Sequence, residues 1–139
     1  MHREVEMFEE IVPGLVGESE VLVGEKMTAR HLGSGDVSVF ATPEMVRLME
    51  RAAVAAVDAQ LPEGHATVGV GLDVRHLAAT PVGMRVSARA ELKAVAGREL
   101  TFEVTAWDET EPVGSGVHKR FVVDLERFRR RVGDKRKET

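Results

Sequence analysis

The sequence predicts an α+β fold in which an antiparallel β-sheet wraps around one long central helix. A single segment with helical apolar spacing follows Thr42, and almost everything after that segment alternates apolar and polar residues with the period of β-strands. An antiparallel sheet with one apolar face must cover that face. The only large apolar cover in this chain is the helix, so we expect the sheet to curl around it.

A short strand and the long helix make up the first half of the chain. The strand is expected near residues 19–23. The helix is expected to begin at Thr42, whose hydroxyl would cap it, with Pro43 at the first helical position. It should run to about Leu61, because Pro62 follows. Small and apolar residues cover most of its surface, so we expect it to be largely buried.

Four strands and a final helix fill the second half. The fourth of these strands is expected at 113–123, weakened by glycines, and Asp124 should cap a short last helix. Turns are expected at 96–98 and 108–111. In the first three strands the residues expected to face the helix are Val68, Val70, Leu72 and Val74; Met84, Val86, Ala88, Ala90 and Leu92; and Leu100, Phe102, Val104 and Ala106.

This order of elements is that of the hotdog architecture, with an α+β sandwich as the alternative that differs mainly in sheet curvature. A chain of 139 residues with no internal repeat and no linker suggests one domain over residues 1–139.

The composition excludes several classes of function. The net charge of −4 and the aromatic content of 4% argue against a nucleic-acid binder, which needs a basic surface or exposed rings. The chain has no cysteine, which excludes disulfides, thiolate metal sites and a cysteine nucleophile. No apolar run approaches the roughly 18 residues that span a bilayer, and residues 1–10 do not resemble a signal peptide. We expect a cytoplasmic protein that binds neither nucleic acid nor membrane.

Two titratable residues stand in unexpected places. Glu50 lies beside the apolar stripe of the long helix, where a carboxylate is costly unless it is paired or functional. An edge position that meets an arginine would also explain it. His76 continues the inward-facing series of its strand, where it could be a core histidine with a satisfied hydrogen bond or a general acid/base.

Three other features remain open from the residues alone. Thr42 could simply cap the helix, or could lie beside an anion or oxyanion at the helix start. Gly69 and Gly71 in one strand indicate either a close approach by a ligand or a bulge. His118 and Arg120 share a strand face and could line a pocket. The histidines show no metal-ligand spacing, so we predict no metal site and no cofactor.

Taken together, the sequence resembles the hotdog thioesterases related to fluoroacetyl-CoA thioesterase. Three stretches carry the likeness: Val39-Phe40-Ala41-Thr42 continuing through Met45-Val46 and Leu48-Met49-Glu50 to Ala52; His76 with Ala78-Ala79-Thr80-Pro81 and Gly83; and Gly114-Ser115-Gly116 followed by His118 and Arg120-Phe121.

The resemblance implies a catalytic set of Thr42, Glu50 and His76, with Gly69 and Arg120 contributing to acyl and coenzyme A binding. It also implies a homodimer, or a higher oligomer, with the active site at the dimer interface. We therefore expect a thioester hydrolase acting on acyl-CoA, with Glu50 as nucleophile or as base on water. For this to hold, Glu50 and His76 should converge on one cavity beside the start of the helix.

One departure from the family concerns the acyl group. The fluoroacetyl-specific member has a longer lid with a phenylalanine before the helix, whereas residues 31–36 here form a short polar segment. We therefore expect a plain short-chain acyl-CoA as the substrate. Two other functions suit the same residues: a non-catalytic acyl-CoA binding module, and a hotdog enoyl-CoA hydratase.

Overall fold

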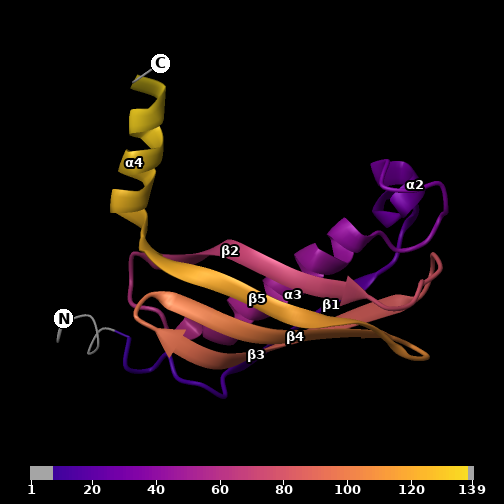
Figure 1. Ribbon diagram of the computed structural model, residues 1–139, viewed down its shortest axis with the longest axis horizontal. Coiled ribbons are helices and arrows are strands. Elements are labelled where there is room, and N and C mark those ends of the chain that lie inside the picture. The colour runs from indigo at the N-terminus through magenta and orange to yellow at the C-terminus, as the bar shows by residue number, and fades with distance from the viewer. Residues whose placement is uncertain (1–7, 138–139) are drawn as a thin grey trace.

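A five-stranded antiparallel sheet with one long helix against it forms the body of the protein (Figure 1). The computed structural model describes residues 8–137. The strands are β1 (Val16–Leu22), β2 (His65–His76), β3 (Arg85–Ala96), β4 (Glu99–Asp108) and β5 (Pro112–Asp124), in the spatial order β1-β3-β4-β5-β2. The helices are α2 (Ala29–Leu32), α3 (Thr42–Val57) and α4 (Leu125–Lys137), with 3-10 turns η1 (Glu25–Met27) and η2 (Asp58–Gln60). The predicted α+β class is confirmed.

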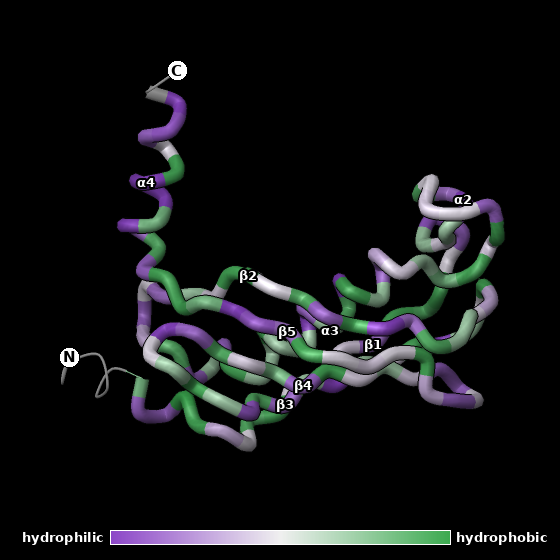
Figure 2. Tube along the Cα trace, in the orientation of Figure 1, coloured by the Kyte–Doolittle hydropathy of each residue, from purple (hydrophilic) through white to green (hydrophobic). Residues whose placement is uncertain are grey.

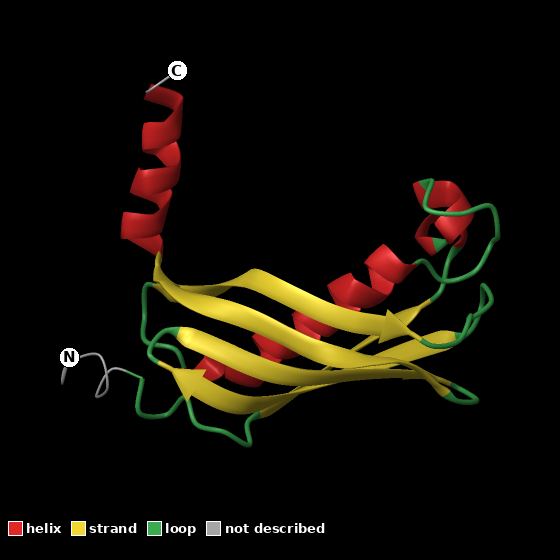
Figure 3. Cartoon of the chain, viewed as in Figure 1, coloured by secondary structure: helices red, strands yellow, loops and turns green. Residues whose placement is uncertain are grey.

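The central helix α3 lies along one face of the sheet (Figure 3) and is buried as predicted. Its buried residues are Met45, Leu48, Met49, Ala52, Ala53, Ala56 and Val57. β1 passes so close that a Cβ at Gly17 would stand 2.2 Å from the carbonyl oxygen of Ala52. The regular helix ends at Val57 and continues as η2, so it is shorter than the sequence predicted.

The inward faces of β3 and β4 agree with the predicted alternation. In these two strands the residues that are at most 1% exposed include Val86, Ala88, Ala90, Leu92, Leu100, Phe102, Val104 and Ala106. Strands that keep a strict period of two present one continuous apolar face, and these eight side chains form the floor on which α3 packs.

The predicted alternation of β2 is wrong in its first half. β2 pairs with β5 in a register that shifts between Gly69 and Gly71, so Val70 is an extra residue at a β-bulge. One extra residue moves the neighbouring side chains to the opposite face. Val68 and Val70 therefore line an outer groove with Phe121 rather than the core, and Val70 is 58% exposed.

Beyond the bulge, the side chains of Leu72 and His76 lie on the face of the sheet that packs on α3. There Leu72 stands opposite His118 and His76 stands opposite Gly114. Leu72 is still 39% exposed, because β2 is an outer strand whose second edge pairs with no strand in the described part of the chain.

α4 begins at the predicted cap and then stands away from the sheet (Figure 2). The backbone N–H of Arg127 donates to Oδ1 of Asp124 over 3.1 Å, which is the expected capping bond. Two of its apolar residues, Phe128 and Val132, are 37% and 54% exposed. Among the helices of residues 8–137, none is long and apolar enough to cross a membrane. The cytoplasmic location and the single domain over 1–139 stay predictions.

Candidate active site

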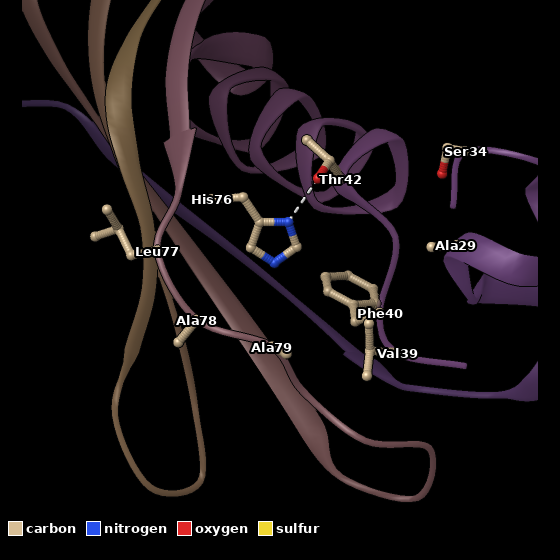
Figure 4. A pocket seen from close by; sticks show the side chains of 9 residues that line it. All are labelled: Ala29, Ser34, Val39, Phe40, Thr42, His76, Leu77, Ala78 and Ala79. Carbon is tan, nitrogen blue, oxygen red and sulfur yellow. Dashed lines mark hydrogen bonds between the residues drawn. The ribbon is translucent and has the colours of Figure 1, made fainter. Parts of the chain in front are cut away.

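A hydrogen bond between Thr42 and His76 joins the start of α3 to the end of β2 (Figure 4). Oγ1 of Thr42 lies 2.7 Å from Nδ1 of His76. The predicted capping role of Thr42 is wrong, because Ala41 is the N-cap and Thr42 is already the first helical residue. The carbonyl of Ala41 accepts the N–H groups of Glu44 and Met45. The hydroxyl of Thr42 is therefore available to the imidazole.

The other nitrogen of His76 is buried and has no hydrogen-bond partner among the described residues. Burial lowers the pKa of His76 below the ordinary value of 6.5, and the backbone at Ala78 opposes this shift more weakly. The ring also meets Phe40 edge-on, with ring centroids 6.5 Å apart. A neutral imidazole with one anchored and one unused nitrogen is equipped to exchange a proton or a hydrogen bond with a ligand.

His76 opens onto a largely apolar pocket of about 390 Å³ (Figure 4). Its lining residues are Ala29, Ser34, Val39, Phe40, Thr42, His76, Leu77, Ala78 and Ala79. Small and apolar side chains thus surround the polar pair.

Glu50 and Arg120 form a second cluster further along α3. Oε2 of Glu50 lies 3.5 Å from Nη1 of Arg120, with side chains 39% and 8% exposed. Arg120 donates from Nε to Oγ1 of Thr67 over 2.8 Å and from Nη2 to the carbonyl of Thr67 over 2.9 Å. The guanidinium is therefore held in place by the protein on several sides, and its pairing with Glu50 matches the arginine contact that the sequence left open.

Gly69 allows β2 to pass beside this carboxylate. A Cβ at position 69 would stand 2.9 Å from Oε2 of Glu50 and 3.4 Å from Nη1 of Arg120. The bulge interpretation of the two glycines is confirmed, since the register shifts between Gly69 and Gly71, whereas a close approach by a ligand stays a prediction. Thr67 was not among the predicted site residues, because its contact with Arg120 depends on how β2 pairs with β5.

The five predicted site residues fall into two groups within one protomer. Thr42 and His76 share one pocket, whereas Glu50 and Arg120 line another of about 420 Å³ together with Arg47, Arg51 and Val54. At 1.5 Å per residue, about 12 Å of helix separates Thr42 from Glu50. The expected single cavity for Glu50 and His76 is thus not formed inside one protomer, and their joint role stays a prediction.

Metal binding has no candidate in residues 8–137: no group of three or more histidine, aspartate or glutamate side chains is placed to hold an ion.

The model of the fluoroacetyl-CoA-specific thioesterase family matches residues 23–126. The chain belongs to this family. A curated relative, the fluoroacetyl-CoA thioesterase of Streptantibioticus cattleyicolor, is 45% identical over 97 residues, which is 70% of this chain and 70% of the relative.

Solved structures agree with this assignment. A structure of the fluoroacetyl-CoA thioesterase superposes with a TM-score of 0.82 at 38% identity, covering 89% of this chain and 96% of that one. A variant of that enzyme in complex with fluoroacetate and CoA gives 0.79 at 39% identity, covering 84% and 98%. A hypothetical protein of Thermus thermophilus, a thioesterase superfamily member, gives 0.82 at 29% identity, covering 93% and 98%. The hotdog fold and the family resemblance predicted from sequence are confirmed.

Proposed function

We propose that this member of the family hydrolyses the thioester of a short-chain acyl-CoA. The observation that carries the proposal is the Thr42–His76 hydrogen bond, which leaves the second imidazole nitrogen unused at a largely apolar pocket. Thioester hydrolysis needs a group that activates the attack on the carbonyl and a partner for the departing sulfur. The family supplies the substrate class, since its named relatives are thioesterases of fluoroacetyl-CoA.

The pocket beside His76 takes the acyl group in this proposal. Val39, Phe40 and Leu77 give it apolar walls, and apolar walls favour an alkyl chain over a charged one. The acyl group named for the relatives, fluoroacetyl, has two carbons, which supports a short chain. The polar segment at 31–36 adds no aromatic ring to this wall, which is why we propose a plain acyl group rather than fluoroacetyl.

A second copy of the chain completes the site. β2 is an open edge of 12 residues with exposed apolar side chains, a surface that favours pairing with another strand. Two β2 strands paired antiparallel about a twofold axis at Asp73, with the bulged Val70 left out of the ladder, would set Gly69 of the partner subunit opposite His76. Because Gly69 lies beside Glu50, this pairing would bring Glu50 of the partner subunit toward the Thr42–His76 pocket.

The reaction then divides between the two groups. When the hydroxyl of Thr42 donates to Nδ1, the neutral imidazole carries its proton on Nε2 and donates a hydrogen bond to the departing sulfur. The carboxylate of Glu50 takes a proton from water as the water oxygen bonds to the carbonyl carbon. The carbon–sulfur bond then breaks. The thiolate receives the proton that Glu50 took from water, and a carboxylic acid and free coenzyme A leave. Direct attack by Glu50 would instead expel the thiolate and form an anhydride, and ¹⁸O found in Glu50 after a single turnover in labelled water would identify that route.

A thiol-release assay over short, branched and aromatic acyl-CoAs tests the proposal. We expect turnover with at least one short-chain substrate, and its loss in Glu50→Gln and in His76→Ala. Tight acyl-CoA binding without thiol release would instead identify a binding module, and hydration of an enoyl-CoA without thiol release would identify a hydratase. Either result, or full activity in both variants, would contradict the proposal.

A further inference from the structure

We propose that His118 is a positioning residue that fixes Arg120, and through Arg120 fixes the carboxylate of Glu50. The expected effect on kcat rests on the proposed function, whereas the contacts of His118, Arg120 and Glu50 do not depend on it. His118 takes no part in the reaction as described above, yet it is 1% exposed and lies behind the Glu50–Arg120 pair.

The two ring nitrogens of His118 have separate partners. Nδ1 lies 2.9 Å from the carbonyl oxygen of Gly71, which can only accept a hydrogen bond. Nδ1 must therefore carry the proton, which leaves a lone pair on Nε2. That lone pair faces Nη1 of Arg120 at 3.2 Å. The backbone beside the bulge thus selects the tautomer of His118, and the tautomer makes it an acceptor for Arg120.

Arg120 transmits this placement to Glu50. Its Nε and Nη2 are both held by Thr67, and Nη1 lies between Nε2 of His118 and Oε2 of Glu50, at 3.2 and 3.5 Å. With the other nitrogens fixed, the acceptor on His118 determines where Nη1 points. A carboxylate that must reach a substrate in a fixed geometry depends on such support, since a displacement of about 1 Å can cost 10²-fold in rate.

The charged groups around His118 favour the neutral ring that this role requires. Arg120 lies on its own strand and Glu50 on α3, while β4 contributes the uncharged ring of Phe102. Burial lowers the pKa of His118, Arg120 lowers it further, and the Gly71 carbonyl and Glu50 oppose the shift. A protonated ring would lose the lone pair and set a second positive charge beside Arg120.

Two substitutions distinguish the contribution of Nδ1 of His118 from that of Nε2. In His118→Asn the side-chain amide can still donate to Gly71 but does not extend to Arg120. In His118→Gln the longer side chain can present its oxygen to Arg120. We expect kcat to fall at least about tenfold in His118→Asn with a smaller change in KM, and His118→Gln to restore much of kcat at a similar melting temperature. Equal kcat in both variants would overturn the proposal.

A measurement on the unaltered protein remains decisive even if the Asn variant does not fold. Nitrogen-15 NMR of His118 should show the proton on Nδ1, and the Nη protons of Arg120 should exchange slowly with solvent. A proton on Nε2 would overturn the proposal, because Nε2 could then accept nothing from Arg120. If the protein releases no thiol from any acyl-CoA, the proposed function fails while this measurement still judges the role of His118.

Discussion

The hydroxyl of Thr42 and Nδ1 of His76 lie 2.7 Å apart, at the point where the beginning of α3 meets the end of β2. A threonine inside the first helical turn would ordinarily turn its hydroxyl to solvent or to a nearby backbone carbonyl. Here it fixes the orientation of a half-buried imidazole instead, and with it the direction of the unused nitrogen.

Replacing Thr42 tests this orientation. Thr42→Val keeps the branched shape and removes the hydroxyl, so His76 loses the group that holds its ring in place. We expect kcat for thiol release to fall about tenfold or more, with a smaller effect on KM. Thr42→Ser is the matched control, because it keeps the hydroxyl and should retain most of the activity. A valine variant as active as the serine variant would show that the hydrogen bond is dispensable.

The pH dependence of His76 follows from its burial. Because desolvation lowers the pKa of the imidazole, the neutral form persists at pH values below 6.5. Only under more acidic conditions should the ring be protonated, and Nδ1 would then donate to the hydroxyl of Thr42 instead of accepting from it. An NMR titration of the His76 ring should have its midpoint below 6.5, and a midpoint above that value would refute this account of the site.

A methyl group at position 69 should disturb the carboxylate. Gly69→Ala sets a Cβ 2.9 Å from Oε2 of Glu50, so the carboxylate must shift. We expect kcat to fall about tenfold or more, by the same sensitivity to sub-ångström placement. Gly71→Ala on the same strand is the control: its Cβ would be in ordinary contact with Cβ of Lys119 at 3.7 Å, and φ is positive at neither position. Equal losses in the two variants would mean that the strand, and not the carboxylate, is sensitive.

The close approach of β1 to α3 makes a prediction about stability. Gly17→Ala would place a Cβ 2.2 Å from the carbonyl oxygen of Ala52 and 2.3 Å from the backbone nitrogen of Ala56. Backbone on both sides has no room to relax, so we expect the free energy of unfolding to fall by about 3 kcal/mol. Gly24→Ala, which meets nothing within 4 Å, should stay within about 0.5 kcal/mol of the unaltered protein in denaturant melts.

How far the sequence predicted the fold depends on local regularity. β3 and β4 keep an unbroken apolar alternation where they pack on α3, and their inward residues were predicted correctly. A bulge was one of two interpretations of Gly69 and Gly71, but its effect on the facing of Val68 and Val70 was not predicted, because one extra residue in a run of valines and glycines leaves the apparent alternation intact. The N-cap of α3 was misplaced by one residue: Ala41 is the cap, so Pro43 lies one position further into the helix than predicted.

For the candidate site, the sequence predicted which residues take part but not how they are arranged. Glu50 and His76 were recognised because each is polar on an otherwise apolar face. Which arginine meets Glu50, and what holds it, could not be predicted in the same way: the contact of Arg120 with Glu50 joins β5 to α3, and Thr67 meets Arg120 through the pairing of β2 with β5. A single sequence does not predict that these residues divide between two pockets, because that division depends on the curvature of the sheet and on what pairs with its open edge.

Subunit complementation tests the shared site most directly. His76→Ala and Glu50→Gln should each be inactive alone. If His76 of one subunit works with Glu50 of the other, a mixed dimer of the two variants contains one site with both residues intact, and random exchange should restore about one quarter of the unaltered activity. No recovery, in a mixture shown by mass spectrometry to contain the mixed dimer, would contradict a site shared between subunits.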